Sequence, residues 1–467
     1  MKKSKLLTMV FLALPILLAT GCRNEKVDES EKYLKVNEKI TEYIYTYYLW
    51  EDLLPEQVNI PKTDPFEFFR SLRSYAPDDE KNKWSVLAES RDDFYASVGN
   101  SGKSFGYSLV FYQFTDMDNE IWAVVQYVHP DTPAEKAGIK RGNLISRIGG
   151  ELMTDGGAND FRNLVYADML TVTVHESIED ETGREVSMQS VKSYLDPIFN
   201  CKIIERGSHR IAYLMYTDYV QDSEKDLSAL FSEFKSAGAT DLILDLRYNG
   251  GGYTSTALRM ASLIAPSNAL DGKNIFSQFT YNEWYTAYLK LLGLYESYSI
   301  LRYPEKEDVP ENLDLDRVFV LTTRSTASAS EQTIIGLDPY MEVITIGTGS
   351  HGKFVGGSVY PPSSDKNDMY GWGMYLITFW YVNSEGKPGV NAGLVPDYEI
   401  KEDWHTYKPI GDESDPLIAQ ALSIITGEPV PQSAPAAEEF LHAKEIWSSR
   451  PGFETGTLIY NADKFDL

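Results

Sequence analysis

The chain of 467 residues is too long for one hydrophobic core, so two or three domains are expected. Its 69 acidic and 43 basic residues give a formal net charge of -26, which argues against nucleic acid as a partner because phosphates are repelled. Two cysteines and six scattered histidines form no zinc-like cluster, so no metal and no cofactor are predicted.

Residues 1–22 have the pattern of an export signal. Lys2, Lys3 and Lys5 precede an apolar stretch that is too short to span a bilayer. The stretch ends in Leu-Ala-Thr-Gly-Cys, which resembles a bacterial lipobox and predicts a lipid on Cys22; the alternative is an ordinary signal peptide. A lipid there would anchor the protein to a membrane of the cell envelope, and we expect the periplasmic face, with the outer membrane slightly favoured.

Residues 23–98 are predicted to form a polar tether followed by a small helical region. Apolar and aromatic residues recur at three- and four-residue steps over 32–54, which is typical of a helix. Asp64-Pro65 opens a second helical stretch over 66–72. We interpret the aromatic residues of this region as core rather than as ligand contacts.

Residues 99–195 change to short strands separated by turns, which predicts a β-rich domain. Pro133 can begin a short helix that Gly138 ends. The predicted strands are Tyr107–Phe111, Trp122–Tyr127, Leu144–Ile148 and Leu170–Val174.

From residue 196 to about 428, strands alternate with helices, which predicts an α/β domain with a largely parallel sheet. An aromatic-rich insertion, 266–316, is a lid, a substrate wall or only packing. No role is assigned to the extension 429–467. The predicted strands are Ile211–Tyr216, Leu242–Leu246, Val318–Thr322, Val343–Ile346 and Tyr375–Tyr381, and the predicted helices are 223–237, 254–264, 328–337 and Pro416–Ile425.

The first motif that could carry catalytic chemistry is Ser328-Ala-Ser-Glu331, which follows an apolar strand. It fits a capping box, with Ser328 at the N-cap and Glu331 at the third position of the helix. Most such matches are only helix starts. A serine in this place also lies beside unpaired N–H groups and the positive end of the helix dipole, which suits a nucleophile whose product carries an oxyanion.

The second motif is a Gly-rich turn after strand 343–346 that presents Lys353. A lysine in such a loop is usually a solvated charge. It acts as a general base only where burial in an apolar pocket lowers its pKa, and Ser-Lys pairs are a variant of the Ser-His-Asp triad. His351 is a further candidate base, ranked below Lys353.

The third motif is Leu-Arg-Tyr-Asn-Gly-Gly-Gly, at the end of strand 242–246. Its glycines let backbone N–H groups approach a ligand and could supply half of an oxyanion hole. The alternative is a tight turn between a strand and a helix. A phosphate loop would need a Gly-Lys-Ser/Thr ending, which is missing.

In this order the three motifs resemble those of the C-terminal processing (tail-specific) serine peptidases. That family has a D-L-R-x-N-x-G-G segment, then an S-A-S-A-S-E-like segment, then Gly-Lys. The resemblance implies that Ser328 is the nucleophile and that Lys353, 25 residues later, is its base. It also implies an oxyanion hole from the N–H groups of Ala329 and of a glycine in 250–252, with Gly251 preferred, on a crotonase-like ββα core.

The β-rich stretch 99–195 resembles the PDZ domain of the same family. The run that matches the carboxylate-binding loop is Phe105, Gly106, Tyr107, Ser108 and Leu109. Backbone N–H groups in such a loop bind a terminal carboxylate while an edge strand pairs with the peptide, which would explain a preference for C-terminal tails. The alternative is a domain that only gates or braces the active site.

Two positions near the proposed catalytic pair depart from the family pattern, and Gly142-Asn143 stands where PDZ sequences often have Gly-Asp. Gly357 stands where many members have a glutamine four residues after the lysine. Pro339 stands where many have an aspartate, with Asp338 beside it. The group that orients Lys353 is therefore left open by the sequence.

These observations together predict a multidomain α/β lipoprotein that acts as a serine endopeptidase in the cell envelope. Its partners would be protein or peptide substrates with free C-termini, and an acyl-enzyme would form without a cofactor. The rivals are a non-catalytic PDZ-bearing lipoprotein that binds peptides or other ligands, and a scaffold whose PDZ module only tethers partners.

Overall fold

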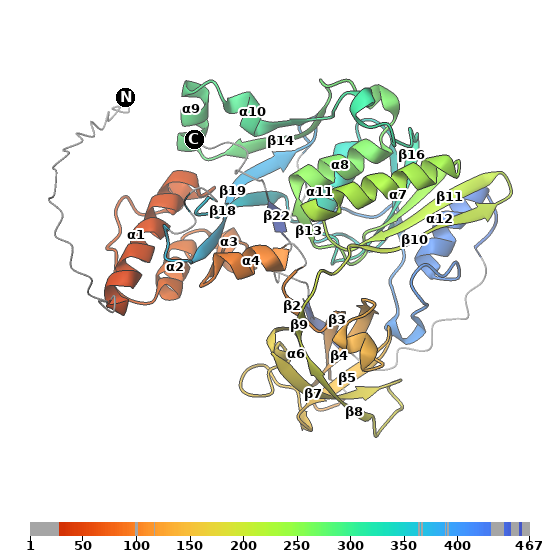
Figure 1. Cartoon of the computed structure of the whole chain (residues 1–467), viewed down its shortest axis with the longest axis horizontal. Helices are drawn as coiled ribbons and strands as arrows, with labels where there is room; N and C mark the ends of the chain where they lie inside the picture. The colour runs from red at the N-terminus through yellow and green to blue at the C-terminus, as the bar shows by residue number, and fades with distance from the viewer. Residues whose placement is uncertain are drawn as a thin grey trace, which may run out of the picture.

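The computed structural model shows a helical N-terminal lobe, a β-rich lobe and a larger α/β core (Figure 1). Among the residues it describes, no helix is long and apolar enough to cross a membrane. The lipid site predicted at Cys22 lies outside those residues. The structure describes residues 28–98, 101–115, 117–362, 365, 368–387, 389, 392–430, 443–449 and 457–459.

The N-terminal lobe is helical, as predicted. Its first helix starts after Asp28, whose carboxylate accepts a first-turn N–H, and the second starts after Asp64 in the same way. The apolar sides of these helices pack on Met374 and Leu376 of the core, so the prediction that their aromatic residues are core is confirmed. The helices are α1 (Glu29–Tyr47), α2 (Pro65–Arg73), α3 (Pro77–Asn82) and α4 (Arg91–Val98).

The β-rich lobe is an antiparallel sheet with the order β21-β3-β4-β5-β7-β8. All four strands predicted in this region are present. The first strand in that order comes from the C-terminal extension. The elements are β2 (Lys103–Ser104), β3 (Tyr107–Phe114), β4 (Glu120–Val128), α5 (Pro133–Lys136), β5 (Leu144–Ile148), β6 (Glu151–Leu152), α6 (Asn163–Tyr166), β7 (Met169–His175), β8 (Arg184–Gln189), β9 (Val191–Lys192) and β21 (Ala443–Ser449).

The core is built on a sheet with the order β10-β11-β12-β16-β17-β20, parallel except for its first strand. Helices α7, α8 and α11 cover one face and α12 covers the other (Figure 1). The predicted α/β domain is therefore confirmed. The elements are β10 (Ile198–Arg206), β11 (His209–Tyr216), α7 (Glu224–Ser236), β12 (Asp241–Asp245), α8 (Thr254–Ile264), β16 (Arg317–Thr322), α11 (Ala329–Leu337), β17 (Glu342–Gly347), β20 (Tyr398–Glu399) and α12 (Pro416–Thr426).

The predicted strand Tyr375–Tyr381 was wrongly placed in the parallel sheet. It is part of β19, which pairs antiparallel with β18 and β14 in a second sheet. A strand buried on both faces is apolar throughout in either sheet, so periodicity does not separate the two cases. This sheet contains β1 (Val86–Ala88), β13 (Gly251–Tyr253), β14 (Ile275–Tyr281), β15 (Ile300–Arg302), β18 (Val355–Tyr360), β19 (Gly373–Val382) and β22 (Thr457–Ile459).

The insertion 266–316 contributes both packing and an exposed helical hairpin. Its strands β14 and β15 complete the second sheet. Helices α9 (Glu283–Leu291) and α10 (Tyr295–Ser299) lie at the outer end of that sheet, away from α12 (Figure 1). Much of the insertion is therefore a structural part of the core.

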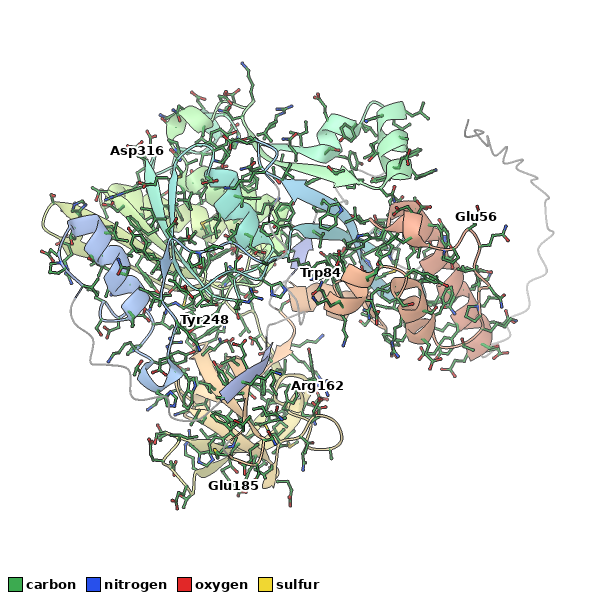
Figure 2. All side chains as sticks on the ribbon, turned by 180° about the vertical axis from the view of Figure 1, so that it is seen from behind. Glu56, Trp84, Arg162, Glu185, Tyr248 and Asp316 are labelled. Atoms are coloured by element: carbon green, nitrogen blue, oxygen red, sulfur yellow. The ribbon has the colours of Figure 1, made fainter. Side chains whose placement is uncertain are left out.

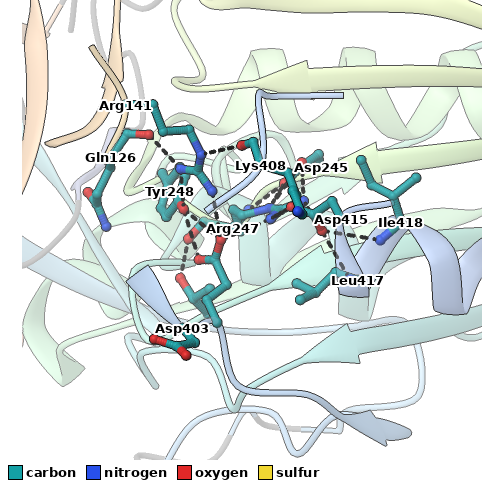
Figure 3. Close-up of polar contacts among 12 residues, drawn as sticks. Gln126, Arg141, Asp245, Arg247, Tyr248, Asp403, Lys408, Asp415, Leu417 and Ile418 are labelled. Atoms are coloured by element: carbon teal, nitrogen blue, oxygen red, sulfur yellow. Dashed lines mark hydrogen bonds and ion pairs between the residues drawn. The ribbon is translucent and has the colours of Figure 1, made fainter. Parts of the chain in front are cut away.

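A buried arginine joins the end of β12 to α12 (Figure 3). The Arg247 side chain is 1% exposed, and its guanidinium lies 2.9 Å from a carboxylate oxygen of Asp245, 2.8 Å from Asp415 and 2.9 Å from Glu402. Burying a charge is unfavourable unless it is paired and hydrogen-bonded. Three carboxylates meet that requirement and hold the start of the glycine turn in place.

The same network reaches into the β-rich lobe. Arg141 donates to the Tyr248 hydroxyl at 2.8 Å and to Glu402 at 3.1 Å, and it stacks on the Tyr407 ring at 3.7 Å. Arg141 lies in the turn before β5, whereas the other three residues belong to the core. The two lobes are thus joined by charged and aromatic contacts that Figure 3 shows in one cluster.

We expect Asp415→Asn to lower the free energy of unfolding at pH 7 by about 3 kcal/mol, because it removes one of the three charged partners of the buried Arg247 guanidinium. Asp415 also caps α12 by accepting the Leu417 N–H at 3.0 Å. Burial alone raises the pKa of Asp415, but Arg247 brings it below its ordinary value. A depressed pKa means stabilisation above about pH 4 that is lost as the pH falls through the folded-state pKa.

Urea denaturation at pH 7 and pH 3 tests this, with a smaller difference expected at pH 3. The matched control is Glu428→Gln, because Glu428 is exposed just beyond the end of α12. An equal effect of the two substitutions would contradict the assignment.

Candidate active site

Ser328 lies at the turn from the parallel sheet into α11. It is the N-cap residue, as predicted, and its backbone has φ +60° and ψ -111°. Residues other than glycine seldom adopt such a conformation, and strain of this kind clusters at functional sites. Ser328 is fully buried, and its hydroxyl makes no hydrogen bond with any residue that the structure describes. The hydroxyl is therefore available at the positive end of α11.

Lys353 lies in the loop between β17 and β18 and is fully buried. Its Nζ atom lies 5.5 Å from the ring centre of Tyr375 and 6.0 Å from that of Trp84. Figure 2 shows Trp84 between the N-terminal helices and the core. An aromatic wall excludes water from an amine, which disfavours its charged form, although the ring faces attract the cation. The burial that a lysine base needs is present.

Glu331 connects the serine loop and the lysine loop. Its Oε2 accepts the backbone N–H of Ser328 at 2.8 Å and that of Lys353 at 3.0 Å. Its Oε1 accepts the Gly352 N–H at 2.7 Å and the Ser350 hydroxyl at 2.5 Å. Burial raises the pKa of this carboxyl, and the four donors oppose that shift. One carboxylate oxygen is therefore shared by the two predicted catalytic residues.

Tyr381 of β19 joins the same two residues at their carbonyl groups. Its hydroxyl lies 3.0 Å from the Ser328 oxygen and 3.1 Å from the Lys353 oxygen, and it donates its one proton between them. Burial and the nearby Glu331 raise the pKa of Tyr381, which keeps it protonated. The backbones of the serine and the lysine are thus tied at both their N–H and their C=O groups.

The two predicted oxyanion donors differ in their availability. The Ala329 N–H, in the first turn of α11, donates to none of the described acceptors. The Gly251 N–H donates to Asn249 Oδ1 at 2.8 Å, so an oxyanion would have to displace that contact. Within the described part of the chain, the Gly250 N–H meets no acceptor. The assignment of Gly251 stays a prediction.

The glycine turn lies directly against the start of α11. The Asn249 carbonyl accepts the Ala327 N–H at 3.0 Å and the Ser330 hydroxyl at 3.2 Å. Gly252 has φ +140°, and a Cβ there would lie 2.1 Å from the Tyr219 oxygen. Only glycine fits such a close approach. All three sequence motifs therefore meet at one place.

The predicted carboxylate-binding loop lies at the start of β3. The Gly106 N–H donates to the Ser104 hydroxyl at 2.9 Å, and the Tyr107 hydroxyl donates to the Leu164 oxygen at 2.7 Å. Phe105 and Leu109 are buried, so they are part of the lobe's core. The remaining loop residue, Ser108, donates to Gln126 at 2.9 Å.

The departures from the family pattern have structural explanations. A Cβ on Gly357 would lie 2.0 Å from the Leu376 oxygen, so no glutamine fits there. Asp338 pairs with Lys387 at the surface, at 2.9 Å, and is not a partner that orients Lys353. In the residues described, no group of three or more His, Cys, Asp or Glu side chains could hold a metal ion.

Three residues of the site were not predicted in their observed roles. Glu331 was identified only as a capping residue, although its place in the serine motif marked it. Tyr381 and Trp84 carry no local motif, because they reach the site from another sheet and another lobe. No pattern in the sequence could have selected them.

Comparison with known proteins shows what the chain is similar to. Residues 210–400 match the model of Peptidase family S41. A carboxyl-terminal-processing protease of Picosynechococcus is 24% identical over 300 residues, which are 64% of this chain and 65% of that protein. The carboxy-terminal processing protease CtpA of Bacillus subtilis is 24% identical over 393 residues, or 80% of this chain and 77% of that protein. The alignment to the first relative thus spans just under two thirds of its length.

The solved structures add a similar fold. A Bacteroides fragilis protein assigned to the S41 proteases superposes with a TM-score of 0.65 at 25% identity. The match covers 83% of this chain and 97% of that structure. The similarity therefore extends well beyond residues 210–400.

We expect Tyr381→Phe to slow the labelling of Ser328 by a fluorophosphonate probe at least tenfold. Losing the hydroxyl removes the shared donor from the two carbonyl groups, at about 1–3 kcal/mol, although the Ser328 oxygen still accepts the Gln332 N–H at 2.8 Å, and it loosens the serine and the lysine relative to each other. The matched control is Tyr303→Phe, because the buried Tyr303 hydroxyl donates to the Gly336 oxygen at 2.9 Å, in the same helix. Both variants should lose similar stability, and only the first should lose labelling; parallel losses would refute a positioning role.

Proposed function

We propose that this chain, whose residues 210–400 match the model of Peptidase family S41, is a serine endopeptidase of the C-terminal processing type. The observation that carries the proposal is the junction of two buried residues. Ser328 and Lys353 share Glu331 at their N–H groups and Tyr381 at their carbonyl groups, while the serine hydroxyl has no hydrogen-bond partner among the described residues.

In the proposed reaction, Lys353 acts as a neutral amine and takes the proton of the Ser328 hydroxyl as its oxygen attacks the scissile carbonyl. The N–H groups of Ala329 and of a glycine in 250–252 stabilise the oxyanion. The lysine ammonium then gives its proton to the leaving amine, and an acyl-enzyme remains. Water, deprotonated by Lys353, releases the acyl group and regenerates the serine.

We further propose that the β-rich lobe, residues 99–195, is a PDZ domain that binds substrate tails. The loop from Phe105 to Leu109 leads into β3, whose outer edge accepts an added strand in this structure. The core 196–428 would be the crotonase-like peptidase unit. A lipid on Cys22 would keep the enzyme at a membrane of the cell envelope, where tails of exported proteins are the substrates.

Substitution of the proposed catalytic pair tests the mechanism. We expect Ser328→Ala to abolish fluorophosphonate labelling and Lys353→Met, which keeps an apolar chain of similar length, to slow it by about 100-fold to 10,000-fold. Lys387→Met is the control, because Lys387 is an exposed lysine of the same domain. Hydrolysis of an unstructured peptide should fall in parallel. Labelling of Ser328→Ala at the wild-type rate would contradict the assignment of Ser328 as the nucleophile.

A further inference from the structure

The C-terminal extension returns to the body of the protein as two strands. β21 pairs with β3 in the β-rich lobe. β22 lies between β13 and β18 in the core. Figure 1 shows β22 at the centre of the molecule, where the three lobes meet. Figure 2 shows β21 as a blue strand along the β-rich lobe.

β21 has the position and direction expected of a tail bound to a PDZ domain. Ala443 lies opposite Phe114 and Ser449 lies opposite Leu109, so β21 runs antiparallel to β3 with its carboxyl end toward the loop that precedes β3. Strand addition to this edge is how such a domain binds a C-terminal peptide. The tail-binding edge of β3 is therefore occupied by the protein's own chain.

Side chains reinforce this pairing. Ile446 lies at an irregularity of the pairing and packs against the apolar core of the lobe. The Ser448 hydroxyl donates to the Leu109 oxygen at 3.3 Å. Lys444 is exposed. The strand thus has apolar contacts at Ile446 and Ala443 and the backbone ladder, as a peptide ligand would.

β22 lies across the proposed active site. Thr457 is opposite Gly251, which begins β13, and Ile459 is opposite Gly357 of β18. β13 continues from the glycine turn, and β18 follows Lys353. Glycines on both neighbours allow close backbone approach. A strand in this place lies between the elements that carry the oxyanion donors and the base, where an extended substrate would have to enter.

We propose that β21 and β22 act as an intramolecular ligand, β21 on the tail-binding edge and β22 in the substrate strand position, and that a substrate tail must displace them. The tail-binding role of the edge and the effect on turnover rest on the proposed function, whereas the pairing of the two strands does not. A tethered ligand competes at an effective concentration of about 1 mM, so added peptides bind the intact protein weakly.

Peptide binding by the full chain tests the occupancy. In a Ser328→Ala background, Ile446→Asp removes the apolar anchor, and Lys444→Ala is the control on the same strand. The probe is a fluorescent peptide with the sequence of residues 443–459, followed by anisotropy. We expect Ile446→Asp to bind it at least tenfold more tightly than the control does. Equal affinities, or no binding by either protein, would overturn the proposal.

Hydrogen exchange gives a second readout that needs no ligand. The β3 amides that face β21 should exchange at least tenfold faster in Ile446→Asp than in Lys444→Ala, while those of β7 should not change. A chain that ends at Val430 should match Ile446→Asp if it folds. Unchanged exchange in β3 would show that β21 does not protect this edge and would overturn the proposal.

Turnover separates this inference from the proposed function. With Ser328 intact, Ile446→Asp should cleave an unstructured peptide at least fivefold faster than Lys444→Ala does, at a subsaturating peptide concentration. Tighter peptide binding and faster hydrogen exchange in Ile446→Asp, without any turnover or probe labelling, would refute the peptidase assignment. The occupancy would still stand. Equal turnover in Ile446→Asp and Lys444→Ala, together with tighter peptide binding in Ile446→Asp, would show that displacement of the strands does not limit activity.

Discussion

The Glu331 carboxylate holds the candidate site together. It is fully buried, and a buried charge is tolerated only where hydrogen bonds replace its hydration. Its four donors come from the first turn of α11 and from the loop after β17. The carboxylate therefore ties the backbone at Ser328 to the loop that carries Lys353.

Other residues around the Glu331 carboxylate further restrict the positions of Ser328 and Lys353. Tyr381 fixes the carbonyl groups on the opposite side, and the ring of Trp84 closes the lysine pocket from the N-terminal lobe. The glycine turn is held by Asn249 and, at its beginning, by the ion pairs of Arg247. The site is thus assembled from five segments of the chain: the start of α11, the loop after β17, β19, the glycine turn and the N-terminal lobe.

The Arg247 network and the C-terminal strands both connect the β-rich lobe to the core, in different ways. Arg141 bridges to Tyr248 and Glu402 through side chains, next to the glycine turn. β21 and β22 bridge through backbone pairing, on the edge of β3 and beside β13. A ligand that replaces β22 would therefore lie beside Gly251 of the glycine turn.

The sequence by itself predicted most helices and strands of the core, because helix caps, glycine turns and hydrophobic periodicity are set by neighbours along the chain. The order of its motifs, through their family resemblance, selected Ser328 and Lys353 as candidates. Only the tertiary structure decided the burial of Lys353 beside Trp84, the tie through Tyr381, the antiparallel place of β19 and the return of the chain as β21 and β22. These depend on contacts between segments far apart in sequence. A lone aromatic residue or an edge strand carries no local mark of its partner.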